Sequence, residues 1–259
     1  MLSQLKRHAF RLLIGLLAVV AFYLDATQPA NQRYVSKFED ALYDYRLNLA
    51  QHRDKFDSVV ILDLDEKSLA KQGQWPWSRD KLAVLLDQLF DHYGVAVLGF
   101  DIVFPEPDRS SGLDVLRGLG NKELKDVPQY QSTLSEIARK LDYNRLFADK
   151  LKSRPVVMGY SFQTEEDPGK AAQAWQIPPP VFPAGAFQNN AIPYAFKSYV
   201  ANLSALQKNA AGGGFFTIMP EDDGVMRRVP MLVQYKDEYY ETLSLAMMRN
   251  MLGKPNLIP

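Results

Sequence analysis

The sequence predicts an α/β domain with a mixed, mostly parallel sheet, flanking helices and a C-terminal antiparallel hairpin, preceded by one transmembrane helix. Three observations lead to this prediction. An uncharged apolar run lies near the N-terminus, strand-like runs alternate with helical patterns in the middle, and strand patterns separated by short turns follow near the end. Strands that alternate with helices are typical of layered α/β folds, whereas strands joined by tight turns pair antiparallel.

The apolar run at residues 12–24 carries no charge, Lys6, Arg7 and Arg11 lie before it, and Asp25 follows it. Basic residues before an apolar span and none directly after it are typical of a segment that enters a membrane with its N-terminus inside.

The length of the run leaves three interpretations. The apolar span is 16 residues long when residues 9–24 are counted, roughly 24 Å of helix against a hydrocarbon core of ~30 Å. An uncleaved signal anchor over residues 1–26, a cleaved signal peptide and a buried soluble helix all fit. We expect the anchor, because the following DATQPA is a poor cleavage site.

A membrane-proximal helix is predicted within residues 27–57, ahead of an α/β domain at 58–259. Aromatic and leucine side chains recur there at steps of 4, 4, 3 and 4, which places them on one helical stripe. The stripe consists of Tyr34, Phe38, Leu42, Tyr45 and Leu49. It either packs on its own domain or forms a stalk that meets a second copy.

The α/β domain begins with a predicted parallel pair. Residues 58–65 are apolar and β-branched and predict a buried strand, residues 78–94 predict a helix, and residues 95–101 predict a second buried strand. The helix would start at the cap residue Ser78, bury a leucine face and end at Gly94. Strand, helix and strand in this order predict a βαβ unit.

The rest of the domain continues the alternation. A helix at 142–154 and a strand at 155–162 are predicted, with long irregular segments at 104–130 and 163–193 that are rich in Pro, Gly or charge. The final residues predict strands separated by an acidic turn at 221–224 and a second turn at 236–238. A helix from about residue 241 follows.

Composition excludes several sites and partners. The chain has 30 basic and 30 acidic residues and no cysteine, so neither nucleic-acid binding nor disulfide, thiol or Cys-zinc chemistry is favoured. His8, His52 and His92 have no metal-ligand spacing. We expect no cofactor and no nucleic-acid partner; bound ions remain open.

The candidate site lies where the two predicted strands end. Asp65 and Asp101 each end one strand, and Asp63 shares a strand face with Asp65. Parallel strands end at one sheet edge, where open α/β sheets bind ligands, so we expect these carboxylates to lie close together.

Arg79 falls in the first turn of the predicted helix, where a cation opposes the helix dipole. Asp65 or Asp101 is its expected partner, with Trp75 and Trp77 covering the pair. An ionic corner, a small-ligand or ion pocket and a catalytic site remain open as interpretations.

An Asp-dependent metal phosphohydrolase is the alternative from another class, because a strand that ends in Asp-x-Asp begins haloacid-dehalogenase-type phosphatases. That motif is normally followed by Thr or Val, whereas this chain has Lys67. The later acidic pair, Asp222 and Asp223, precedes Gly224 and predicts a β-turn instead. Both departures count against this chemistry.

Two stretches resemble one known family. The run VVILDLDEKSLAKQGQWPWSRDKLAVLLDQL with GVAVLGFDIVFPEPD, and the later GFFTIMPEDDGVMRRVPMLVQYKDEYYETLSLAMMR, are similar to the type-two CHASE domain. The resemblance covers about residues 35–252. Trp-Pro-Trp-x-Arg and Gly-Phe-Asp are its most specific elements.

This resemblance implies an extracytoplasmic sensory domain with a membrane anchor, further transmembrane helices and a cytoplasmic output domain. Adenylate or guanylate cyclases, histidine kinases, diguanylate cyclases and serine/threonine kinases are the outputs it implies. No output motif occurs in this chain, so we expect it to have no enzyme activity of its own. We also expect a homodimer in the bacterial inner membrane, with the main domain in the periplasm and an unknown periplasmic ligand or protein partner.

Overall fold

The computed structural model describes residues 2–28, 34–50, 58–166, 175–187, 194–221 and 223–258. The chain divides into two compact units. One comprises Met1–Asp63 with Pro220–Arg227, and the other Leu64–Met219 with Arg228–Pro259. The short segment 220–227 thus belongs to the same unit as the N-terminal helices, although residues of the sheet domain precede and follow it in the sequence.

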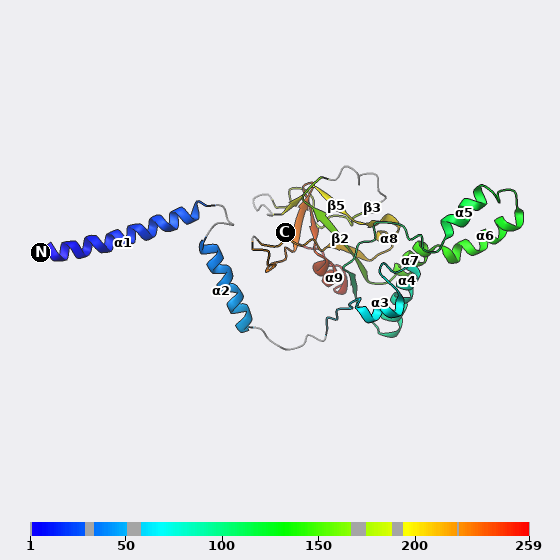
Figure 1. Cartoon of the computed structure of the whole chain (residues 1–259), viewed down its shortest axis with the longest axis horizontal. Coiled ribbons are helices and arrows are strands. Elements are labelled where there is room, and N and C mark those ends of the chain that lie inside the picture. Colours follow the sequence, from blue (N-terminus) through cyan, green and yellow to red (C-terminus); the bar gives the residue numbers. More distant parts are fainter. Residues whose placement is uncertain are drawn as a thin grey trace. The chain divides into compact units, whose positions relative to one another are not determined.

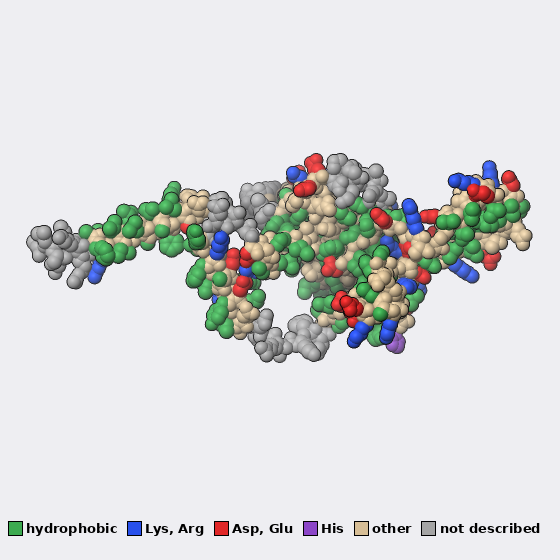
Figure 2. All heavy atoms as spheres, viewed as in Figure 1, with side chains coloured by type: hydrophobic (Ala, Val, Ile, Leu, Met, Phe, Trp, Pro, Cys, Tyr) green, Lys and Arg blue, Asp and Glu red, His purple; other side chains and the backbone are tan. Residues whose placement is uncertain are grey.

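The first unit contains α1 (Leu2–Ala26) and α2 (Tyr34–Ala50). Residues His8–Ala26 of α1 are long and apolar enough to cross a membrane, and none of this stretch is buried. Figure 2 shows hydrophobic side chains along the visible face of α1. An N-terminal apolar helix consistent with an anchor is therefore present.

The helix predicted from the aromatic stripe is confirmed as α2. No residue of α2 is buried among the described parts of the chain, and Tyr34 and Phe38 are 80% and 65% exposed. The Asp25 carboxylate of α1 accepts hydrogen bonds from the backbone N–H groups of Tyr34 (2.6 Å) and Val35 (3.4 Å). This contact satisfies two otherwise open donors in the first turn of α2 and joins it to α1.

The main sheet of the second unit is built around β2 (Val156–Gln163). This strand pairs in parallel with β1 (Leu98–Phe100) and β7 (Gly212–Phe215), and antiparallel with β5 (Ser198–Val200). The prediction of a mixed, mostly parallel sheet is confirmed.

Helices cover this sheet as the apolar patterns predicted. The predicted helix at 78–94 is α4 (Arg79–Asp87), which continues as a short π-helix η2 (Gln88–His92). The helix before β2 is α7 (Tyr143–Leu151). Together with β1 and β2 these helices bury one core, which includes Leu82, Leu86, Phe100, Phe147, Leu151 and Met158.

The predicted C-terminal hairpin is confirmed as β8 (Leu232–Tyr235) and β9 (Glu238–Glu241), which pair antiparallel. Lys236 and Asp237 form its turn with positive φ values of 49° and 63°, as expected for a two-residue hairpin. β4 (Ala195–Phe196) adds a parallel strand to β8, and α9 (Leu243–Met251) follows. The remaining short elements are β3 (Trp175–Gln176), which pairs with β6 (Asn202–Leu203), and α8 (Ser204–Gln207).

The prediction of a buried strand at residues 58–65 is wrong. These residues form no strand, and Val59, Val60 and Ile61 are 72–88% exposed. A β-branched run forms a strand only where a neighbouring strand supplies its ladder, and sequence propensity does not specify that neighbour. The parallel partner of β1 is instead β2, so a strand–helix–strand unit runs from β1 through α7 to β2.

The prediction that residues 104–130 form an irregular segment is also wrong. It contains α5 (Leu113–Asn121) and the start of α6 (Pro128–Leu141), and Figure 1 shows this helical hairpin projecting beyond α7. Its Pro and Gly residues suit the hairpin. Pro128 occupies the first turn of α6, where proline is tolerated, and Gly120 lets Tyr130 and Leu134 approach closely. Of the segment predicted at 163–193, residues 167–174 and 188–193 lie outside the described residues.

Candidate functional site

The predicted site residues on the loop before α4 are held by local contacts. Asp65 caps α3 (Glu66–Gln72), because its Oδ1 accepts from the Ser68 hydroxyl (2.7 Å) and the Ser68 N–H (2.8 Å). These two hydrogen bonds lower the pKa of Asp65. Trp77 donates from Nε1 to the Gly73 carbonyl (2.8 Å), and the Trp75 and Trp77 rings lie 6.1 Å apart.

Arg79 is buried and contacts a different segment from the expected one. Its backbone N–H donates to Asp108 (2.7 Å), its Nη2 donates to the Glu106 carbonyl (2.8 Å), and its guanidinium lies 4.3 Å from the Phe104 ring centre. Burial lowers the pKa of Arg79 to about 10, partly offset by the charge of Asp108. The chain leaving β1 therefore holds this cation.

Asp63 and Asp101 are exposed. The structure places Asp101 directly after β1, as predicted, but Arg79 binds Asp108 and Glu106 rather than Asp65 or Asp101. The two tryptophans and Asp65 remain near the start of α4 in sequence, each with its own local partner. A ligand-binding role for these residues stays a prediction.

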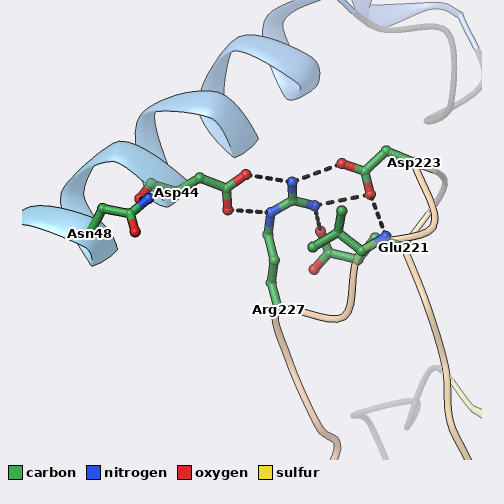
Figure 3. A network of polar contacts seen from close by, with 6 residues as sticks. Asp44, Asn48, Glu221, Asp223 and Arg227 are labelled. Atoms are coloured by element: carbon green, nitrogen blue, oxygen red, sulfur yellow. Dashed lines mark hydrogen bonds and ion pairs between the residues drawn. The ribbon is translucent and has the colours of Figure 1, made fainter. Parts of the chain in front are cut away.

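A second polar cluster, which the sequence did not predict, lies in the first unit (Figure 3). Arg227 binds Asp44 of α2 through two parallel hydrogen bonds, from Nε and from Nη2, each 2.7 Å long. It also binds Asp223 through Nη2 (2.7 Å) and Glu221 through Nη1 (3.0 Å). Paired hydrogen bonds between a guanidinium and a carboxylate are among the strongest polar contacts in proteins.

The turn at 221–225 shapes this cluster. The Gly224 N–H donates to the Glu221 carbonyl (2.8 Å), and the Glu221 N–H donates to the Val225 carbonyl (3.0 Å). Gly224 has a φ of 80°, which favours glycine. The Val225 N–H donates to Asp223 Oδ1 (3.0 Å), so the backbone of the turn orients this carboxylate toward Arg227.

The electrostatics of the cluster favour the charged forms of Asp44, Asp223 and Arg227. The hydrogen bond from Arg227 lowers the pKa of Asp44, and the same partner with the Val225 N–H lowers the pKa of Asp223 to about 2. The carboxylates in turn raise the pKa of Arg227. Carboxylates cover the Arg227 side chain, which is only 5% exposed, whereas Asp44 and Asp223 remain 41% and 46% exposed.

The sequence predicts the acidic turn at 221–224 but not the cluster that forms around it. The available signal was Arg227, a cation four residues after Asp223. Its partner Asp44 lies 183 residues earlier in the sequence, and no periodicity links the two positions. Among the described residues, no group of three or more His, Cys, Asp or Glu could hold a metal ion.

The fold and these contacts define an α/β domain joined to an N-terminal apolar helix, with no metal cluster among its described residues. A family model for the CHASE2 domain matches residues 14–259, and the chain belongs to this family. CHASE2 is an extracytoplasmic sensory domain of signalling receptors and is not catalytic. Neither the curated proteins nor the solved structures contain a match to this chain.

Proposed function

We propose that the chain is the sensory module of a bacterial transmembrane receptor that controls a cytoplasmic adenylate or guanylate cyclase. In this proposal residues 1–26 anchor it in the inner membrane, residues 27–57 form a membrane-proximal helix, and residues 58–259 sense a cue in the periplasm. A histidine kinase, a diguanylate cyclase or a serine/threonine kinase is the alternative output.

One observation carries the proposal beyond the family: a continuous set of polar contacts from the apolar helix to the 220–227 segment. Asp25 of α1 binds the first turn of α2, and Asp44 of α2 binds Arg227. The chain returns to the sensory domain directly after Arg227. A displacement of this segment would therefore act on α2 through a short, charge-assisted contact, which is the kind of contiguous network that can carry coupling.

The output of the full-length receptor tests this function. We expect removal of residues 58–259 to change output activity in membranes, and to abolish its response to periplasmic conditions. Arg227→Met should alter basal output in the same direction, because it disconnects α2 from the segment. A receptor whose output is identical to wild type in both variants under all conditions would contradict the proposal.

The exposed stripe of α2 supports a homodimer. Asp44 lies about 120° around the helix from this stripe, at about 100° per residue, so α2 can bind Arg227 and still present its aromatic side chains. In the described structure nothing buries the stripe. A second copy would cover it as an extension of paired membrane helices.

Cysteine cross-linking tests the dimer without background, because the chain has no cysteine. We expect Leu42→Cys, within the stripe, to form a disulfide-linked dimer in oxidised membranes, since equivalent stripe positions would face each other. Asp40→Cys, about 160° away from the stripe on the same helix, is the matched control. Equal cross-linking at both positions, or none at Leu42→Cys, would argue against this interface.

A further inference from the structure

A cleft of about 220 Å³ lies at the root of the α5–α6 hairpin, which projects beyond α7 in Figure 1. Three stretches line it: residues 107–111, the start of α5, and residues 141–144, where α6 ends and α7 begins. These stretches include both chain connections through which the hairpin joins the domain. A molecule in the cleft would therefore contact the two ends of the hairpin and the start of α7 together.

The floor of the cleft is fixed by hydrogen bonds. The Asp108 carboxylate accepts from the N–H groups of Arg79 (2.7 Å) and Ser110 (2.8 Å). The Asn144 amide binds the backbone of Asp108 in both directions, at 3.0 and 3.1 Å. Burial opposes ionisation of Asp108, but these N–H groups outweigh it and lower its pKa. Asp108 is therefore ionised, and both of its carboxylate oxygens already accept hydrogen bonds from the protein.

The rim carries four charges whose ion pairs with one another are long, although Asp142 also accepts a hydrogen bond from the Arg145 N–H (3.1 Å) as the cap of α7. Arg109 lies 3.6 Å from Asp114, and Arg117 lies 3.9 Å from Asp142. Both separations exceed the length of a hydrogen bond. The Arg109, Asp114 and Arg117 side chains are 50–76% exposed, so their donors and acceptors remain available to a ligand.

We propose that this cleft binds a small zwitterion of the α-amino-acid type. Its carboxylate would bind the guanidinium groups of Arg109 and Arg117, which suit planar carboxylates, and its ammonium group would bind Asp114 and Asp142. The two cations and two anions of the rim cancel, and the charge of Asp108 in the floor is offset by that of the neighbouring Arg79, so a ligand with net charge would leave one sign in excess. The volume equals roughly seven water molecules, which limits the ligand to a small amino acid.

The role of this ligand as the periplasmic cue rests on the proposed sensory function. Its binding at the root of the hairpin would fix the hairpin against α7. The binding itself is measurable without any output domain. Calorimetry on the full chain in lipid nanodiscs would use L-alanine and L-glutamine as probes, with succinate as a net anion and putrescine as a net cation. We expect saturable binding of an amino acid and none of succinate or putrescine.

Two substitutions locate the site. Arg117→Gln and Asp114→Asn should each weaken amino-acid binding by about tenfold or more, since each removes one partner of a charge-assisted contact. Arg139→Gln, on the exposed end of α6 outside the cleft, should leave it unchanged. Absence of amino-acid binding, equal binding of succinate or putrescine, or full binding by Arg117→Gln would overturn the proposal. Amino-acid binding with no change in receptor output would instead contradict the sensory function and leave the site standing.

Discussion

Replacing Gly214 of β7 with alanine is expected to destabilise the sensory domain by about 3 kcal/mol, the upper end for an overpacked site. An added Cβ would lie 2.5 Å from the Leu243 Cα and 2.6 Å from the Thr242 carbonyl oxygen. Both are backbone atoms at the start of α9, where the Thr242 hydroxyl accepts from the Leu245 N–H. Neither atom can rotate away, so β7 and α9 would have to separate.

Urea unfolding of the full chain in detergent, followed by tryptophan fluorescence, measures this effect as a lower transition midpoint. Gly118→Ala is the matched control. Gly118 lies within α5, and an added Cβ there would meet no atom within 4 Å. Because alanine favours helix over glycine, this control should be neutral or more stable by up to about 1 kcal/mol. Equal midpoints for the two variants would show that β7 does not pack so closely on α9.

Arg227→Met is expected to release α2 from the 220–227 segment. The substitution keeps an unbranched side chain but leaves the carboxylates of Asp44, Glu221 and Asp223 without their shared cation, so they repel one another. Spin labels on Asn48→Cys and Val225→Cys would report the change as a broader distance distribution than in the labelled parent. Asp40→Asn, one turn earlier on α2 and not a partner of Arg227, should keep the narrow distribution.

The same spin labels measure how the contact between α2 and the 220–227 segment depends on pH. The pKa of Asp223 is about 2 in the folded chain, below its ordinary value of 3.8. A lowered pKa contributes stability that is present above the ordinary value and is lost as the pH falls through the folded value. We therefore expect one narrow distribution from pH 8 to pH 5 and broadening only toward pH 2. Broadening between pH 7 and pH 5 would mean that these carboxylates are not held by Arg227.

Local patterns predicted those elements whose side chains repeat with a helical or strand period. The leucine face of α4, the apolar run of β2 and the turn of the β8–β9 hairpin are of this kind, and each is confirmed. Residues 58–65 show the limit of such patterns. Residues 58–65 favour a strand as strongly as the residues of β2 do. However, β2 pairs with strands on both of its sides, whereas residues 58–65 form no strand.

The candidate site divides in the same way. The sequence placed Asp101 at the end of a strand and Arg79 in the first turn of a helix, and these local positions are correct. Asp65 was expected to end a strand as well, but no strand forms there and it caps α3 instead. The partner of Arg79 could not be predicted, because Asp108 follows β1 in a loop of unspecified path. Several carboxylates lie within a few residues of the strand end. Only the path of the chain decides that Asp108 accepts from the Arg79 N–H and that the guanidinium binds the Glu106 carbonyl.

By itself the sequence determined the apolar N-terminal helix, the helix with the exposed aromatic stripe, the alternation of helices and strands, and the likeness to CHASE2 domains. Tertiary structure alone decided that Arg227 binds Asp44, 183 residues earlier, and that charges from the hairpin and from α7 meet in one cleft. Helical and strand periods depend on neighbours a few residues apart. Contacts between distant residues depend on how the whole chain packs, and no local period records them.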